Sequence, residues 1–174
     1  MSQRSVTVYI GTSLDGYIAT KDDSLEWLLN TPGDGDNGFG EFYNTVDTVI
    51  MGRRTYDWIL EHDGVSPYPD KEVYVYTRGE HENHDNITFT SEDISALIHR
   101  LKEKNGGRIW IVGGAEVIKI CRENKLIDEY ILSISPVILG EGISLFAEGV
   151  KEELKLFTIK NYGEFAELHY IKKN

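Results

Sequence analysis

Three places in the sequence combine the end of an apolar run with groups that bind phosphate. In the first, residues 109–112 run directly into Gly113 and Gly114 and then into a helix-like segment that begins at Glu116. Glycine lets a backbone approach a ligand closely, and the free N–H groups at the start of a helix attract an anion such as pyrophosphate. The same segment also fits a plain strand-to-helix turn, because short glycine motifs frequently have no ligand.

The other two places add guanidinium groups and hydroxyls after an apolar run. The residues that follow the runs are Gly52, Arg53 and Thr55 in one place, and Thr77 and Arg78 in the other. Arginine presents a planar set of donors that matches the oxygens of a phosphate. Because ligands of open α/β sheets lie beyond the carboxyl ends of the strands, three such ends together indicate a nucleotide rich in phosphate.

The elements that must position these groups are strands that alternate with helices. The expected strands are Val6–Ile10, Tyr17–Ala19, Thr48–Met51, Glu72–Tyr76, Ile109–Val112, Glu129–Ser135, Leu154–Ile159 and Phe165–Ile171. The expected helices are Phe39–Val46, Arg54–Leu60, Ile94–Leu101 (after a capping box at Thr90–Asp93) and Glu116–Glu123. No helix separates the last two strands, so the sequence predicts a mixed sheet that is parallel in its middle and antiparallel at its C-terminal edge.

The composition is typical of a soluble globular protein and argues against several partners. The 174 residues include 29 acidic and 18 basic side chains, and the formal net charge of −11 would repel nucleic acid and anionic membranes. The single cysteine, Cys121, cannot form an intrachain disulfide, and no apolar run approaches the roughly 20 residues that span a bilayer. We therefore expect one cytoplasmic domain over residues 1–174 that binds neither nucleic acid nor a membrane. We expect no metal, because the polar stretch His81–Asp85 lacks the spacing of a zinc motif.

Four motifs, taken in order, resemble those of the dihydrofolate reductase superfamily. Ser13–Ala19 is similar to the S-L-D-G-x-I-A signature of the reductase domain of riboflavin biosynthesis and its stand-alone relatives. Met51–Thr55 resembles the M-G-R-x-T motif, Thr77-Arg78 the Ser/Thr-Arg pair, and Val112–Gly114 the Gly-Gly element of the superfamily. The resemblance implies a three-layer α/β fold with a mixed, mostly parallel central sheet. It also implies a reductase that transfers hydride to a pyrimidine- or pterin-like substrate, related to 5-amino-6-(5-phosphoribosylamino)uracil reductase.

The same resemblance implies NADPH as the cofactor and assigns residues to it. Gly52, Arg53 and Thr55 are expected to contact phosphates, and Thr77 and Arg78 the region of the 2′-phosphate. The pyrophosphate is expected to lie on Gly113, Gly114, Ala115, Glu116 and Val117. Ser13, Trp27 and Phe42 are expected on the side of the heterocyclic substrate. A homodimer is compatible with the resemblance, since riboflavin-type relatives pair through their sheets.

The proton donor is not fixed by these motifs. The resemblance implies a carboxylate on a helix that precedes the Met51-Gly52 strand, and the residues available there are Asp36 and Glu41. Glu41 fits an exposed helix face equally well, and a third candidate, Asp15, also fits an Asp-Gly turn. Two alternatives to the riboflavin-type reductase therefore stay open: a true dihydrofolate reductase, and a module that binds NADPH without turnover.

Overall fold

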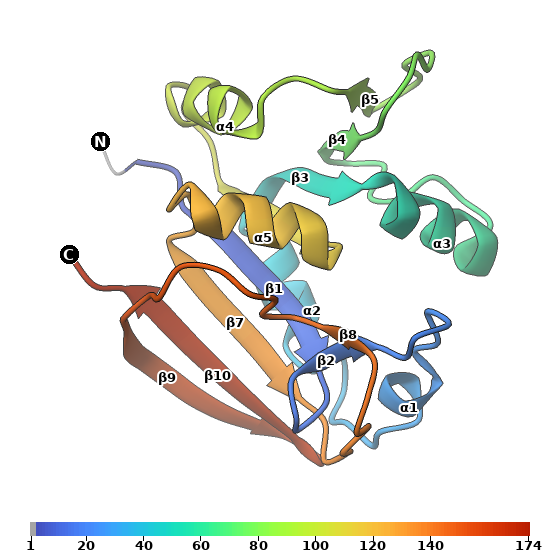
Figure 1. The fold of residues 1–174 in the computed structure, drawn as a ribbon, viewed down its shortest axis with the longest axis vertical. Coiled ribbons are helices and arrows are strands. Elements are labelled where there is room, and N and C mark those ends of the chain that lie inside the picture. The colour runs from blue at the N-terminus through green and yellow to red at the C-terminus, as the bar shows by residue number, and fades with distance from the viewer. Residues whose placement is uncertain (1–2) are drawn as a thin grey trace.

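The computed structural model describes residues 3–174 and is built on one eight-stranded sheet (Figure 1). The strand order is β5-β4-β3-β6-β1-β7-β10-β9, and every neighbouring pair is parallel except β7/β10 and β10/β9. The strands are β1 (Val6–Thr12), β3 (Val46–Gly52), β4 (Glu72–Tyr76), β5 (Ile87–Thr90), β6 (Arg108–Gly113), β7 (Glu129–Ile134), β9 (Leu154–Tyr162) and β10 (Phe165–Lys172). The expected mixed sheet with an antiparallel C-terminal edge is confirmed. A second, small antiparallel sheet joins β2 (Tyr17–Ala19) to β8 (Ile143–Ser144).

Helices cover both faces of the large sheet, which gives the three layers. The helices are α1 (Glu26–Leu29), α2 (Phe39–Tyr43), α3 (Arg53–Asp63), α4 (Ile94–Lys102) and α5 (Ala115–Glu123). Side chains of α4 and α5 share one core cluster with β1, β3 and β6, whereas α2 and α3 contribute to a second cluster on the opposite face. None of the helices within residues 3–174 is long and apolar enough to cross a membrane.

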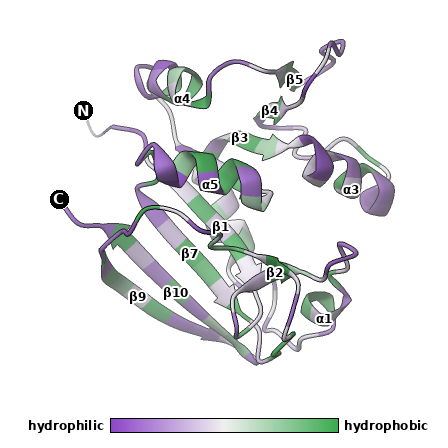
Figure 2. Ribbon diagram, viewed as in Figure 1, coloured by the Kyte–Doolittle hydropathy of each residue, from purple (hydrophilic) through white to green (hydrophobic). Residues whose placement is uncertain are grey.

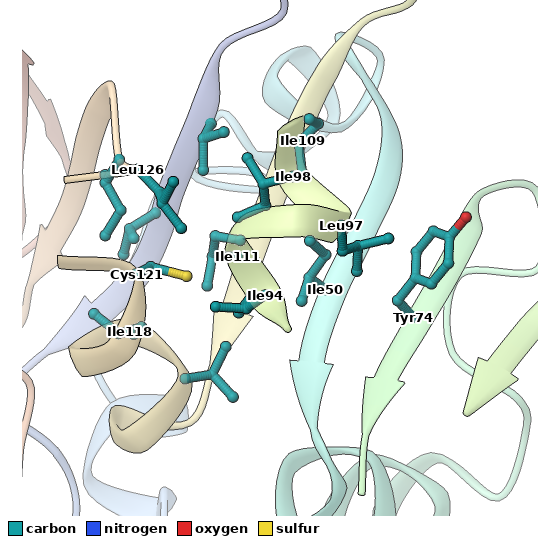
Figure 3. Packing of buried hydrophobic residues seen from close by; sticks show 14 of the residues in the cluster. Ile50, Tyr74, Ile94, Leu97, Ile98, Ile109, Ile111, Ile118, Cys121 and Leu126 are labelled. Atoms are coloured by element: carbon teal, nitrogen blue, oxygen red, sulfur yellow. The ribbon is translucent and has the colours of Figure 1, made fainter. Parts of the chain in front are cut away.

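The core beneath α4 and α5 consists of fully buried aliphatic side chains. Figure 3 shows Leu97 and Ile98 of α4 above Ile50 and Ile111 of the neighbouring strands, and all four are fully buried. Such parallel strands are apolar on both faces because both faces are covered, as the run of buried residues in β3 illustrates. Cys121 lies in the same cluster, where burial raises the pKa of its thiol to about 12, so it packs as a small apolar residue.

The antiparallel edge has a different pattern. Bands of hydrophobic and hydrophilic residues alternate along β10 and β9 in Figure 2, as expected for strands whose two faces differ. Along β10 the buried residues are Phe165 and Glu167, and Ala166 between them is exposed. A carboxylate therefore occupies a position that the alternation assigns to the interior.

Two local predictions need correction, and some short elements were not predicted. The second helix ends at Tyr43, and not at Val46, because the chain turns at Thr45 and Val46 already pairs with Arg108 in the sheet. The cap of α4 is Asp93, whose carboxylate accepts a hydrogen bond from the Ala96 N–H at 3.0 Å. No capping box starting at Thr90 forms, because that residue ends β5, a four-residue strand that the sequence pattern did not predict. The short helix α1 was also missed.

Candidate functional site

The carboxyl ends of β3 and β6 meet at a pair of glycines. A Cβ added to Gly52, at the end of β3, would lie 3.6 Å from the backbone nitrogen of Gly114 and 3.4 Å from Cγ2 of Val117. A Cβ on Gly114 would lie 3.6 Å from Oγ1 of Thr55. The structure thus brings together Gly52, Thr55, Gly113, Gly114 and Val117, which the sequence placed in two separate motifs. We call this set the glycine cleft.

Two helices begin at the glycine cleft without a side-chain cap. Gly52 is the N-cap of α3 and Gly114 is the N-cap of α5, and neither helix start receives a capping hydrogen bond from a side chain. The first N–H groups of both helices are therefore left to other acceptors. Gly113 has a φ of +137°, which residues with a side chain rarely adopt, and its peptide bond to Gly114 is cis. Uncapped helix starts that converge form a site for an anion such as a pyrophosphate.

Arg53, which follows Gly52, already makes contacts with side chains of the protein. The Nε of Arg53 donates to Oδ1 of Asp57 at 2.8 Å, and its guanidinium lies 5.5 Å from the ring centre of Phe89. One terminal nitrogen of Arg53 is 3.0 Å from the ring of His81, in the loop that follows β4. Ala115 and Glu116 form the first turn of α5, and the Glu116 side chain is exposed.

The end of β4 holds the other two expected cofactor residues. The backbone N–H of Thr77 donates to the carbonyl of Thr90 at 3.1 Å, which extends the pairing of β4 with β5. Arg78 is exposed, and its guanidinium forms no hydrogen bond or ion pair with the residues that the structure describes. Next to it a shallow recess is lined by His81, Phe89 and Ser91, among others. Arg78 is therefore free to meet an anion at this edge of the sheet.

Two of the three candidate carboxylates already accept hydrogen bonds from backbone N–H groups. Asp15 accepts hydrogen bonds from the Ser13 hydroxyl at 2.7 Å and from the N–H groups of Leu139 and Gly140 at 3.1 and 2.8 Å. The Ser13 hydrogen bond, with smaller contributions from the two N–H groups, holds the pKa of Asp15 below its ordinary value, which disfavours a role as an acid.

Asp36 has a comparable structural role at the start of α2. Its two carboxylate oxygens accept from the N–H groups of Gly38 at 3.0 Å and Gly40 at 2.8 Å. Both Asp36 and Glu41 are exposed, and Glu41 lies on the surface of α2. Neither carboxylate is enclosed by the fold in the way that is typical of a catalytic proton donor.

Of the three residues expected to contact the substrate, two are buried. Ser13 is 1% exposed and Phe42 is 7% exposed, with the Phe42 ring stacked on that of Tyr9 at 4.1 Å between centres. Trp27 is half-buried, and its indole N–H donates to the Ser24 carbonyl at 3.1 Å. Only Trp27 of the three is open enough to touch a ligand without rearrangement.

A titratable residue that the motifs did not indicate lies on β10. Glu167 is 7% exposed, and burial raises the pKa of its carboxyl above the ordinary value. The signal was present in the sequence, because Glu167 alternates with Phe165 and His169 and therefore shares their face of the strand. The sequence did not show that this face is covered.

Comparison with known proteins agrees with this architecture. Residues 4–166 match the family model described as the RibD C-terminal domain. The chain belongs to this family. The uncharacterized Bacillus subtilis protein YwjB is 44% identical over 172 residues, which covers 98% of this chain and 99% of YwjB. A second B. subtilis protein, YyaP, also uncharacterized, is 32% identical over 167 residues and covers 90% of this chain and 87% of its own.

Solved structures support the same assignment of fold. A protein from Shewanella sp. PV-4, named for riboflavin biosynthesis, superposes with a TM-score of 0.89 at 30% identity, covering 98% of this chain and 99% of its own. Acinetobacter baumannii RibD superposes with a TM-score of 0.73 at 16% identity, and this RibD C-terminal domain spans 58% of that longer chain. The resemblance to riboflavin-type reductases drawn from the motifs is therefore confirmed, together with the dihydrofolate-reductase-like fold.

Proposed function

We propose that this RibD C-terminal domain is an NADPH-dependent reductase that transfers hydride to a pyrimidine- or pterin-like substrate. It would be related in its chemistry to 5-amino-6-(5-phosphoribosylamino)uracil reductase. The observation that carries the proposal is the convergence of two uncapped helix starts at Gly52 and Gly114. Helix starts of this kind attract phosphate oxygens through free N–H groups and the positive end of the helix dipole.

The residues of the glycine cleft fit the pyrophosphate of a dinucleotide. Gly52 and Gly114 leave space where side chains would stand, and Thr55 adds a hydroxyl 3.6 Å from the Cβ position of Gly114. The backbone N–H groups of Ala115, Glu116 and Val117 belong to the first turn of α5 and would donate to the same anion. When bound, NADPH supplies the hydride, and the protein supplies orientation and a proton.

The exposed guanidinium of Arg78 supports the choice of NADPH over NADH. It stands at the end of β4 beside the recess of His81 and Phe89, where a ring and a phosphate have room. A charged hydrogen bond to the 2′-phosphate would contribute about 1.5–3 kcal/mol. NADH lacks this phosphate and would gain nothing from Arg78.

Calorimetry with NADPH and NADH tests the proposal directly. We expect tight binding of NADPH, weaker binding of NADH, and oxidation of bound NADPH on addition of a ribosylaminopyrimidine or a pterin. Absence of binding by either nucleotide would refute the reductase proposal, because the glycine cleft would then have no ligand of the expected kind.

One observation favours a non-catalytic NADPH-binding module as a second candidate. The carboxylate oxygens of Asp15 and Asp36 accept hydrogen bonds from backbone N–H groups, and Glu41 is exposed. None of the three therefore has the surroundings of a catalytic proton donor. Such a module would bind NADPH tightly and oxidise it with none of the heterocycles. The two candidates therefore separate on turnover and not on binding.

We also propose that two copies of the chain pair through the antiparallel edge of the sheet. Ile159 and Leu156 of β9 are 64% and 46% exposed, and Ile159 pairs with Leu168 of β10 on the same face. No helix lies over β10 and β9 on the near side in Figure 1, the side on which α5 covers the centre of the sheet. The paired face of a second copy would remove this apolar surface from water.

A further inference from the structure

A histidine in the loop between β4 and β5 lies against the arginine that begins α3. One terminal nitrogen of Arg53 is 3.1 Å from Nδ1 and 3.0 Å from Nε2 of His81. A guanidinium is always charged and only donates hydrogen bonds, so the imidazole nitrogen that faces it must accept one. Only a neutral imidazole has a nitrogen that accepts. His81 is therefore neutral in this arrangement, because a proton on it would lie beside a fixed positive charge.

The same histidine lines the recess at the ends of β4 and β5. The volume of the recess is about 570 Å³, within the range of roughly 300–1,000 Å³ that is typical of small-molecule sites. Among the described residues that line it, His81 is the only one whose side chain can become positive, whereas Glu80 and Glu82 are negative. The other side chains of the lining are uncharged and belong to Phe89, Thr90 and Ser91. An anion in this recess therefore depends on cations to offset the two carboxylates.

Two arginines beside the recess have donors that are free to bind an anion. The Nε of Arg53 donates to Asp57, but the second terminal nitrogen of Arg53 forms no hydrogen bond within residues 3–174. The guanidinium of Arg78 likewise has no partner in that part of the chain. Because His81 contacts Arg53, an anion held by the free donors of Arg53 would also lie close to the imidazole.

The charges around His81 come from α3 and from its own loop. Those of α3 are Arg53 and the Asp57 bound to it, and those of the loop belong to Arg78, Glu80 and Glu82. From β5, the ring of Phe89 lies 5.2 Å from that of His81 between centres, and the same Phe89 ring is 5.9 Å from the second imidazole of the loop, His84. Positive and negative charges nearly balance in this set, so the charge of a bound ligand determines whether His81 becomes protonated.

We propose that His81 takes up a proton from solvent when the 2′-phosphate of NADPH binds beside Arg53 and Arg78. The phosphate dianion offsets the repulsion between Arg53 and an imidazolium, and the imidazolium then donates a charged hydrogen bond to the phosphate. Imidazole ordinarily changes its charge between about pH 5 and 8, so the coupling acts near neutral pH. Binding of NADPH therefore strengthens as the pH falls, whereas binding of NADH, which lacks the phosphate, does not. This inference rests on the proposed function and adds to it a selectivity between the two nucleotides that depends on pH.

Calorimetry in buffers of different ionisation enthalpy counts the protons that accompany nucleotide binding. For the full-length wild type near neutral pH we expect a net uptake of up to about one proton per NADPH, and none with NADH. A phosphate monoester loses its second proton at roughly pH 6, so the nucleotide alone would release protons, and net uptake identifies a group of the protein. The affinity for NADPH should rise by at most about tenfold for each unit by which the pH falls.

Two histidine variants assign the proton to a residue. His81→Gln keeps a polar side chain that does not take up a proton in this range, and because His81 is exposed the substitution should leave the fold intact. We expect this variant to bind NADPH without proton uptake and with an affinity that no longer rises as the pH falls. The matched control is His84→Gln, which removes the second imidazole beside Phe89 and should take up protons like the wild type.

Binding of NADPH to the wild type without proton uptake overturns the inference and leaves the reductase proposal in place. Uptake that persists in His81→Gln, or that is lost in His84→Gln while His81→Gln keeps it, overturns the assignment to His81 in the same way. If neither nucleotide binds to the wild type, the reductase proposal fails and the inference fails with it. The two failures are therefore distinguished by whether NADPH binds at all.

Discussion

Replacement of Arg78 by alanine tests the cofactor assignment most sharply. The side chain is exposed and forms no hydrogen bond or ion pair with residues 3–174, so Arg78→Ala should leave the thermal midpoint of unfolding unchanged. Removal of a charged hydrogen bond to the 2′-phosphate should cost about 1.5–3 kcal/mol, which is one to two powers of ten in the Kd for NADPH. Affinity for NADH should stay the same, because that nucleotide has no phosphate for Arg78 to meet.

Calorimetric titration of both nucleotides into both proteins measures this difference. Lys104→Ala removes one positive charge from the turn after α4 and serves as the charge-matched control. Since Arg78 is exposed, the difference between the wild type and Arg78→Ala should shrink as the salt concentration rises. Equal affinity of the wild type for NADPH and NADH, or an equal loss of both in Arg78→Ala, would refute the assignment of the 2′-phosphate to this residue.

Three further predictions concern the cleft, the core and the sheet edge. Gly52→Ala adds a methyl group 3.4 Å from Cγ2 of Val117, so it should weaken NADPH binding in calorimetry far more than it lowers the thermal midpoint; the reverse order would contradict a ligand at the cleft. Leu97→Ala should lower the free energy of unfolding in urea by about 2–5 kcal/mol, because the leucine is fully buried, and a loss below about 1 kcal/mol would mean that α4 packs loosely. Ile159→Lys should convert a dimer into a monomer by light scattering, whereas a wild-type protein that is already monomeric would remove the pairing proposal.

The cleft could be predicted from sequence because its residues act through backbone. Gly52 and Gly114 each follow a buried parallel strand, and parallel strands bring their carboxyl ends to one edge whatever the details of packing. The strands β2 and β4 were predicted to the residue for a related reason, since each consists of a short apolar segment between polar ones. Strand order was not needed for any of these predictions.

The proton donor could not be predicted from the sequence, because the burial of a carboxyl group depends on packing between distant segments of the chain. Asp36 and Glu41 both precede β3, but the Asp36 carboxylate accepts hydrogen bonds from the N–H groups of Gly38 and Gly40, and Glu41 is exposed. Glu167 is separated from Tyr9 by most of the chain, and only the pairing of β10 with β7, and of β7 with β1, brings the two residues to the same face of the sheet. The alternation along β10 shows which face carries Glu167, but it does not show that this face is covered.

Hydrogen bonding and burial together distinguish the carboxylates Asp15, Asp36, Glu41 and Glu167. A carboxylate whose oxygens accept backbone N–H groups, as in Asp15, is stabilised in its charged form and yields neither a proton nor a free acceptor. A buried carboxylate without partners has the opposite properties, because its charge gains most from a ligand that brings donors with it. Glu167 is such a carboxyl, because burial raises its pKa and its oxygens form no hydrogen bond or ion pair with a residue among 3–174.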